Sequence, residues 1–274
     1  MSNSPLSRSI SKPGESVLSP SLLAAITTDP LLDAIGRQLL RLDSGLGLFR
    51  LVHLLDGISR SPVPRPRTII SVGSGEGLHE AFLARLFPDA SVLGVDLRTH
   101  QVDFTLANLS FSQGDLLDPV FTASLPRAEF VCSVECLEHI HEDQRVAESM
   151  GSLVLPGGAL YIQVPFASES DLSDPAVVKE HLEANEHVRP GYTGAGLAEL
   201  CRRAGVRVEH LAGAFWFPMQ PMVWFTLEHF GTDLVLPYWL EFLALALRDV
   251  RDGVPEHRMH STGIKVLAVK DRST

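Results

Sequence analysis

A glycine-rich loop between a short apolar run and a helical pattern constrains the fold of this chain more than any other feature. The apolar run TIISV at 68–72 leads into Gly73, Gly75 and Gly77, and a helical pattern follows at 77–87. Glycine lets the backbone turn sharply and lets a ligand approach the main chain closely. Loops of this kind join a strand to a helix in ligand-binding α/β folds. The loop therefore indicates a ligand site at the end of a buried strand.

Strands and helices alternate along most of the chain. Apolar runs predict seven strands, at 68–72, 91–95, 109–113, 128–134, 158–164, 206–212 and 263–269. Three helical patterns lie between some of them, at 77–87, 136–153 and 193–204. Continuous apolar runs are typical of strands covered on both faces, and their alternation with helices is typical of a parallel sheet. We expect a Rossmann-like, seven-stranded, mostly parallel sheet with helices on both faces.

Sequence patterns also divide the chain into a tail, a helical cap and a main domain. Residues 1–20 are rich in Ser and Pro, which predicts a disordered tail. Leucine and isoleucine recur near helical spacing within 21–60, which predicts an N-terminal helical cap. We expect the main domain over 61–274, with a helical, aromatic-rich insertion at 214–258 before the last strand.

Two acidic residues follow the next two predicted strands. Asp96 comes directly after the run 91–95, where a carboxylate can hold two ribose hydroxyls. Asp115 follows the run 109–113, where it can accept a hydrogen bond from an adenine amino group. Because the C-terminal ends of parallel strands meet at one edge of the sheet, we expect both carboxylates beside the glycine loop.

The order of these segments resembles that of class I S-adenosylmethionine-dependent methyltransferases. The resemblance rests on GSGEG, GVDLR, QGDLLD, FVCSVECLEHIHED and LVLPGGALYIQVPF, in this order within 66–212. It implies that S-adenosylmethionine is the methyl donor and that its site includes Gly73, Ser74, Gly75, Gly77, Asp96, Leu97, Asp115, Leu116 and Val134. A nicotinamide dinucleotide is the alternative ligand of a glycine loop. Its fingerprint separates the second and third glycines by two residues, whereas Glu76 alone stands between them here.

One position departs from the pattern of that family. The family usually has an acidic residue where this chain has Ser71, and the acidic residue helps to hold the methionine part of the donor. We expect Ser71 or a water molecule to take that role, with a modest affinity for the donor.

The segment Glu135-Cys136-Leu137-Glu138-His139 is a candidate metal site. If a helix begins here, the spacing places Glu135, Glu138 and His139 on one helical face. Two carboxylates and an imidazole suit a divalent metal such as Mg²⁺ or Mn²⁺. The segment is similar to the S-x-E-x-x-E-H motif of metal-dependent ubiquinone-pathway O-methyltransferases. It also resembles the E-x-x-E-H of enzymes that 2′-O-methylate small-RNA ends, which implies a later histidine: His187, or else His181.

The same segment also has a metal-free interpretation. Glu138 and His139 would then cap a helix or line the acceptor pocket, since acidic residues are favourable at a helix N-terminus. His139 or His187 could serve as the general base, so the candidate catalytic residues are His139, His187 and Glu138. Both interpretations stay open on the sequence alone.

Composition narrows the choice of acceptor and partner. A net charge of −10, without a cluster of Lys or Arg, disfavours a nucleic-acid acceptor. No apolar run is long enough to predict a membrane span, and three cysteines indicate reduced thiols in a cytoplasmic protein. The aromatic insertion predicts an apolar lid, or a surface for a second subunit in a homodimer.

The expected function is the methylation of a small, largely apolar metabolite: a secondary metabolite, a quinone or a lipid-like acceptor. Methylation of RNA ends and a non-catalytic, donor-binding protein are the alternatives.

Overall fold

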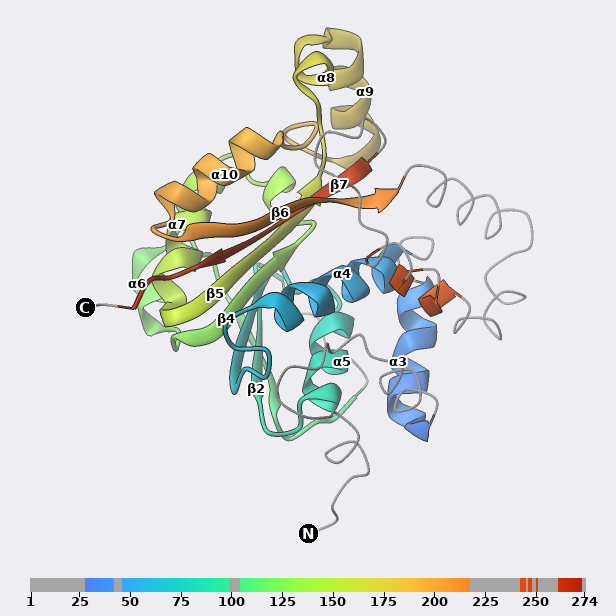
Figure 1. The fold of residues 1–274 in the computed structure, drawn as a ribbon, viewed down its shortest axis with the longest axis vertical. Coiled ribbons are helices and arrows are strands. Elements are labelled where there is room, and N and C mark those ends of the chain that lie inside the picture. The colour runs from blue at the N-terminus through green and yellow to red at the C-terminus, as the bar shows by residue number, and fades with distance from the viewer. Residues whose placement is uncertain are drawn as a thin grey trace.

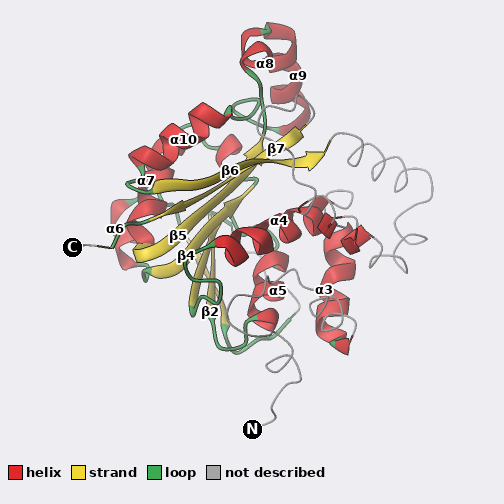
Figure 2. Ribbon diagram, viewed as in Figure 1, coloured by secondary structure: helices red, strands yellow, loops and turns green. Residues whose placement is uncertain are grey.

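One sheet of seven strands forms the centre of the fold (Figures 1 and 2). The computed structural model describes residues 28–41, 46–98, 104–216, 242–244, 246–247, 250 and 261–272. The strand order is β3-β2-β1-β4-β5-β7-β6. The strands are β1 Thr68–Val72, β2 Ser91–Asp96, β3 Leu109–Gln113, β4 Ala128–Val134, β5 Val154–Pro165, β6 Arg207–Trp216 and β7 Ser261–Val269. The prediction of a Rossmann-like, seven-stranded sheet is confirmed.

Within this sheet, β7 alone runs in the direction opposite to the other six strands. β1 pairs in parallel with β2 and β4, β2 with β3, and β4 with β5. β7 is antiparallel to both β5 and β6. The C-terminal ends of β1 to β5 therefore meet at one edge, and the order of the chain reverses between β1 and β4. Open α/β sheets bind ligands at such a reversal.

Helices cover both faces of the sheet (Figure 1). One face carries α3 (Pro30–Arg41), α4 (Leu46–Arg60) and α5 (Leu78–Leu86). The other face carries α6 (Pro119–Ser124), α7 (Asp143–Leu153) and α10 (Gly194–Arg203). Two further helices, α8 (Glu169–Ser173) and α9 (Pro175–Asn185), project from the end of the sheet at the top of Figure 1. Each face has its own hydrophobic core.

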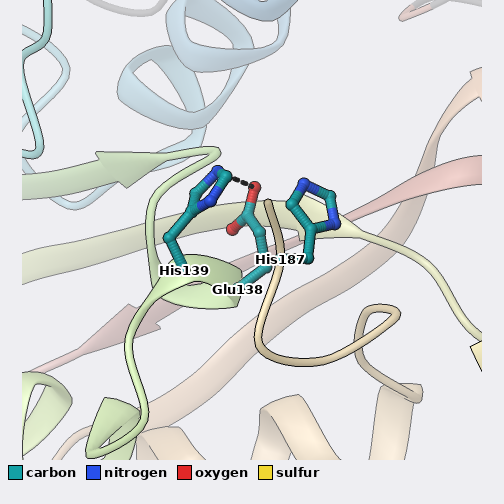
Figure 3. A group of neighbouring side chains, drawn as sticks. All are labelled: Glu138, His139 and His187. Atoms are coloured by element: carbon teal, nitrogen blue, oxygen red, sulfur yellow. Dashed lines mark ion pairs between the residues drawn. The ribbon is translucent and has the colours of Figure 1, made fainter. Parts of the chain in front are cut away.

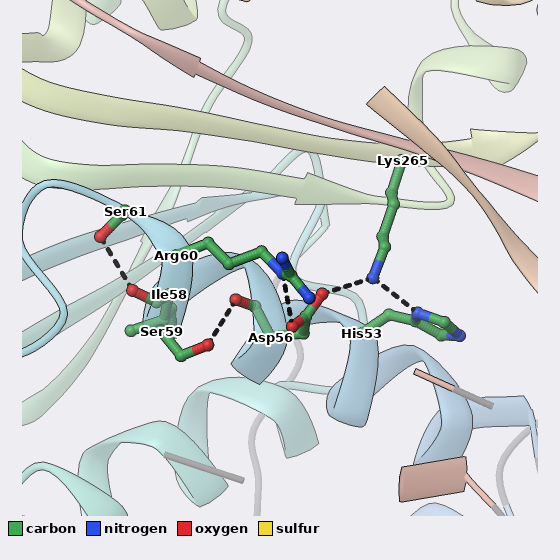
Figure 4. Close-up of polar contacts among 7 residues, drawn as sticks. All are labelled: His53, Asp56, Ile58, Ser59, Arg60, Ser61 and Lys265. Carbon is green, nitrogen blue, oxygen red and sulfur yellow. Dashed lines mark hydrogen bonds and ion pairs between the residues drawn. The ribbon is translucent and has the colours of Figure 1, made fainter. Parts of the chain in front are cut away.

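A buried polar contact joins α4 to the sheet (Figure 4). Lys265 Nζ on β7 donates to Asp56 Oδ2 at 2.7 Å and lies 3.0 Å from His53 Nδ1. A Cβ atom at Gly57 would collide with the ring of Tyr161, so glycine lets α4 lie close to β5. The N-terminal helices thus share one core with the sheet.

Much of the predicted tail and insertion lies outside the described residues. The tail at 1–20 is entirely outside them, as are residues 217–241 of the insertion. The first residues of the predicted helical insertion, 214–216, are instead the end of strand β6. Five buried residues within 214–258 belong to the same core as α3 and α4: Ala214, Phe242, Leu243, Ala246 and Val250. Among the residues that the structure describes, no helix has the length and apolar character needed to cross a bilayer.

The helix predicted at 136–153 begins later than expected. The chain leaves β4 through Glu135, whose φ is 50°, and then forms a single 3₁₀ turn, Leu137–His139. It enters α7 only at Asp143. Arg189 accounts for the interruption, because its Nη2 donates to two carbonyl oxygens between the turn and α7, at 2.6 and 3.1 Å. Those carbonyls are held by a guanidinium group instead of by helical amides.

Candidate functional site

The glycine loop lies at the C-terminal end of β1 and needs glycine for two reasons. Gly73, Gly75 and Gly77 have φ values of 74°, 52° and 76°, which side chains rarely adopt. A Cβ atom at Gly73 would also collide with the Cys136 side chain. At Gly75, in contrast, no atom lies within 4 Å of the position of a Cβ atom. The loop is thus packed on one side and open to a ligand on the other.

Asp96 ties the open part of the loop to the end of β2. Its Oδ2 accepts from the Gly75 backbone N–H at 2.9 Å, and its Oδ1 accepts from the Arg98 N–H at 2.9 Å. An ionised carboxylate has about four acceptor positions, so two amide bonds leave capacity for ligand hydroxyls. Asp115, after β3, accepts from the Leu117 N–H at 2.8 Å.

A cavity of about 550 Å³ opens between the loop and the ends of β2, β3 and β4. Its lining includes six of the residues predicted for the donor: Gly73, Gly75, Asp96, Leu97, Asp115 and Leu116. The other three predicted residues are not part of this lining: Ser74, Gly77 and Val134. The cavity volume lies within the range of about 300–1,000 Å³ that is common for small-molecule sites.

Three candidate metal ligands come together beside this cavity (Figure 3). Glu138, His139 and His187 each offer one ligand atom, and these atoms lie within 4.8 Å of one another. His139 Nε2 lies 3.9 Å from Glu138 Oε1, and the two imidazole rings meet edge to face. The Val188 N–H donates to the Glu138 carbonyl at 2.9 Å, which holds the His187 loop against the turn. His139 also lines the cavity.

The Glu138 carboxyl has an unusual environment. Its side chain is 1% exposed, and neither carboxyl oxygen has a hydrogen-bond partner. Burial, followed by the negative charge of Glu135, raises the pKa of Glu138 well above its ordinary value. A carboxyl in this condition either stays protonated or requires a cation to ionise.

Glu135 stands apart from the other three residues, so the expected shared helical face of Glu135, Glu138 and His139 is wrong. Its positive φ turns it out of the 3₁₀ turn. Its Oε2 instead accepts from Arg50 Nη2 on α4 at 2.9 Å, and both side chains are 15% exposed. The side chain of His181, the second choice for a later histidine, lies outside what the structure describes.

Strained backbone flanks the two histidines. Among the described residues other than glycine, positive φ occurs at Glu135 (50°) and Glu186 (55°). Glu135 directly follows β4, and Glu186 directly precedes His187, while both line the cavity. Such strain costs about 1–3 kcal/mol per residue and gathers at functional sites.

Sequence reasoning missed two arginines that organise this site. Arg50 is separated from Glu135 by 85 positions along the chain, so no local pattern reveals their pairing. Arg189 holds the turn after the 3₁₀ residues and also pairs with Asp143 at 2.8 Å. Its place two residues after His187 was the available signal.

Comparisons with known proteins place most of the site within a methyltransferase domain. The profile of a family described as "Methyltransferase domain" matches residues 48–211. An uncharacterized methyltransferase from Mycobacterium tuberculosis is 36% identical over 107 residues, which are 37% of this chain and 52% of that protein. The match thus spans about half the length of that relative.

Two further proteins extend the comparison. A ubiquinone biosynthesis O-methyltransferase from Xanthomonas axonopodis is 25% identical over 186 residues, which are 60% of this chain and 72% of that protein. A coclaurine N-methyltransferase, solved with N-methylheliamine and SAH, superposes with a TM-score of 0.53 at 13% identity. The superposition covers 82% of this chain and 71% of the other, and it shows a shared fold.

Proposed function

The chain belongs to the class I S-adenosylmethionine-dependent methyltransferase family, and from this premise we propose that it methylates a small, largely apolar metabolite. The observation that carries the donor site of this proposal is the joining of Gly75 to Asp96 in the wall of a ligand-sized cavity. The loop is open at Gly75, and the carboxylate beside it retains acceptor capacity. These are the features that a nucleoside with two ribose hydroxyls requires.

The residues around the cavity fit the donor. Asp96 would accept from the ribose hydroxyls and Asp115 from the adenine amino group, while Leu97 and Leu116 supply apolar surface. Gly73 and Gly75 would let the methionine part approach the main chain. When bound, S-adenosylmethionine supplies a methyl group on a positively charged sulfur. Ser74, Gly77 and Val134 would support the site from behind the lining.

Two roles are open to the residues next to the donor cavity. In the first, His139 takes a proton from the acceptor, and Glu138 steadies the imidazolium that forms. His139 Nε2 lies 3.9 Å from Glu138 Oε1, so a small movement of either side chain would bring the two atoms into hydrogen-bond distance. The chain otherwise aligns the acceptor and excludes water, which accounts for much of the rate enhancement in reactions of this kind.

In the second role, Glu138, His139 and His187 hold a divalent metal such as Mg²⁺ or Mn²⁺. The donor set fits, because one carboxylate and two imidazoles lie within 4.8 Å, and the buried Glu138 oxygens have no hydrogen-bond partners. A metal there would supply a positive charge that acidifies an acceptor hydroxyl. Glu135, which the sequence also suggested as a ligand, would act on the site through Arg50.

The proposal of a small, largely apolar acceptor is based on the apolar character of the segments that we assign to its pocket. The helices α3 and α4 and the buried residues between Phe242 and Val250 form one apolar core next to the sheet. We propose that 21–60 and 214–258 act as the cap and lid of the acceptor pocket. The net charge of −10 opposes an RNA acceptor. A small-molecule acceptor also agrees with the name of the ubiquinone biosynthesis O-methyltransferase and with the N-methylheliamine bound to the coclaurine N-methyltransferase.

The experiment that tests this function uses methyl-labelled S-adenosylmethionine, the purified chain and a metabolite extract. We expect label in the fraction that partitions into organic solvent. Label in RNA would replace the proposal with methylation of RNA ends. Donor binding without any transfer would indicate a non-catalytic, donor-binding protein.

A further inference from the structure

A second buried carboxyl lies behind the glycine loop. Glu80, in the first turn of α5, is 2% exposed, and its Oε2 has no hydrogen-bond partner. Burial raises the pKa of this carboxyl, and hydrogen bonding with the Ser71 hydroxyl, near the end of β1, opposes that effect by favouring the ionised form. Ser71 immediately precedes Val72 and Gly73, which line the donor cavity. Glu80 therefore lies one layer behind the cavity wall.

A structural role does not explain why this carboxyl is buried. Acidic residues stabilise the first turn of a helix, but an exposed carboxylate also does so, without the cost of losing its hydration. Burying a carboxyl with an unsatisfied oxygen is costly unless a cation compensates it. Among the described residues, the charge that acts most on Glu80 is that of Asp96, which is also negative. Glu80 thus lacks the compensation that a buried carboxylate needs.

Among Glu80, Cys132 and His79, Glu80 is the residue whose charge changes near neutral pH. Burial raises the pKa of Glu80 to about 7. Burial, followed by the charge of Glu80, raises the pKa of the Cys132 thiol on β4 to about 12. His79, the preceding residue on α5, bonds to the Gly47 carbonyl, and burial lowers its pKa to about 4. Both neighbours are therefore neutral where Glu80 changes its charge.

We propose that Glu80 is the buried counter-charge of the positively charged donor. Below about pH 7 the carboxyl of the free protein keeps its proton. When S-adenosylmethionine binds with its sulfonium and ammonium groups, Glu80 releases the proton to solvent, and its carboxylate attracts the ligand across the wall formed by Ser71 and Val72. The positive charge of the ligand also offsets the repulsion between Glu80 and Asp96. The inference rests on the proposed donor site and adds a residue to it.

Calorimetric titration of the full chain tests this inference. S-adenosylmethionine should bind about sixfold more tightly at about pH 7.5 than at about pH 5.5, since lowering the pKa of Glu80 from about 7 by about one unit changes the affinity by that factor over this range. Titrations at about pH 6.5 in two buffers of different ionisation enthalpy measure the number of protons released on binding. The wild type should release about half a proton more than Glu80→Gln. In Glu80→Gln the difference in affinity between these pH values should shrink to about threefold or less. Because the ammonium group of the ligand also titrates, the difference between the two proteins is the quantity to compare.

Two controls make the test decisive. 5′-Methylthioadenosine carries no charge, so wild type and Glu80→Gln should bind it alike. If Glu80→Gln does not fold, Ser71→Ala replaces it: removing the hydroxyl that stabilises the ionised form should move the pH midpoint of donor binding upward. Equal proton release by wild type and Glu80→Gln, or an unmoved midpoint in Ser71→Ala, would overturn the role of Glu80 alone. No binding of S-adenosylmethionine by the wild type would overturn the donor site and this inference with it.

Discussion

Replacing Glu138 by leucine should make the protein more stable while removing its activity. The carboxyl is 1% exposed, and neither oxygen is hydrogen-bonded, so the native state carries the cost of desolvating it. Leaving a buried polar group without partners costs about 1–3 kcal/mol. Glu138→Leu removes that cost and retains apolar packing. We expect its free energy of unfolding to exceed that of the wild type by about 1–3 kcal/mol.

The pH dependence of this gain follows from the raised pKa of Glu138. Burial makes ionisation harder in the folded protein than in the unfolded chain, where the carboxyl has its ordinary pKa. Below the ordinary value both states are protonated, and the ionisation penalty is absent. As the pH rises above that value, the unfolded chain ionises first, and the wild type loses stability. The advantage of Glu138→Leu should therefore be larger at about pH 8 than at about pH 4.

Urea unfolding at these two pH values measures the effect. Glu180→Leu, at an exposed position of α9, is the matched control and should change stability by less than about 0.5 kcal/mol. The reasoning is refuted if Glu138→Leu unfolds more easily than the wild type at both pH values. In that case the contacts of the carboxyl with the neighbouring histidine would be favourable on balance.

Manganese distinguishes the two roles of Glu138 in the same assay. If the metal site exists, Mn²⁺ at a hundred times its dissociation constant should stabilise the wild type by about 2.7 kcal/mol. It should leave Glu138→Leu unchanged. If Mn²⁺ stabilises neither protein, the metal-free role of His139 remains.

Three further predictions concern the histidine, the buried lysine and the glycine loop. A chelator should abolish methyl transfer but leave donor binding intact if a metal is bound, whereas full activity in excess chelator together with an inactive His139→Ala would establish a metal-free base. Asp56→Ala should lower the free energy of unfolding by about 3–5 kcal/mol in chemical denaturation, because it leaves Lys265 buried without its carboxylate. Since Lys265 holds the pKa of Asp56 below its ordinary value, the stability from this pair should be present above about pH 4 and lost as the pH falls further. Gly73→Ala should cost more stability than Gly205→Ala and should abolish donor binding in calorimetry, because both glycines have positive φ but open space surrounds the second.

The sheet and the donor-binding residues could be predicted from local sequence. Each strand is visible as an apolar run, and each donor-binding residue lies at the end of a strand or in the loop that follows it. Asp96 and Asp115 end up near the glycine loop simply because parallel strands end at one edge. The helices α8 and α9 also had local signals that the strand and helix patterns do not capture. Ser168 forms a capping box, and Asp174 caps a helix that begins with Pro175.

The acceptor side of the site could not be predicted in the same way. Arg189, which interrupts the helix after β4, lies 49 positions after the carbonyl that it holds. Arg50 pairs with Glu135, which is thereby separated from Glu138 and His139. Such tertiary contacts override helical spacing. The burial of Glu80 was equally hidden, because an acidic residue in a first helical turn is ordinary in a sequence. Its exposed fraction of 2% shows that it faces the interior of the protein.

The most direct test of the whole account is a calorimetric titration of S-adenosylmethionine into wild type and Asp96→Ala. We expect a dissociation constant on the order of micromolar for the wild type, and binding that is at least about tenfold weaker for the variant, since a hydrogen bond to a charged group contributes about 1.5–3 kcal/mol. Asp118→Ala, which removes only the exposed cap of α6, should bind like the wild type. Absence of binding by the wild type, or equal binding by Asp96→Ala, would contradict the donor site on which every other proposal depends.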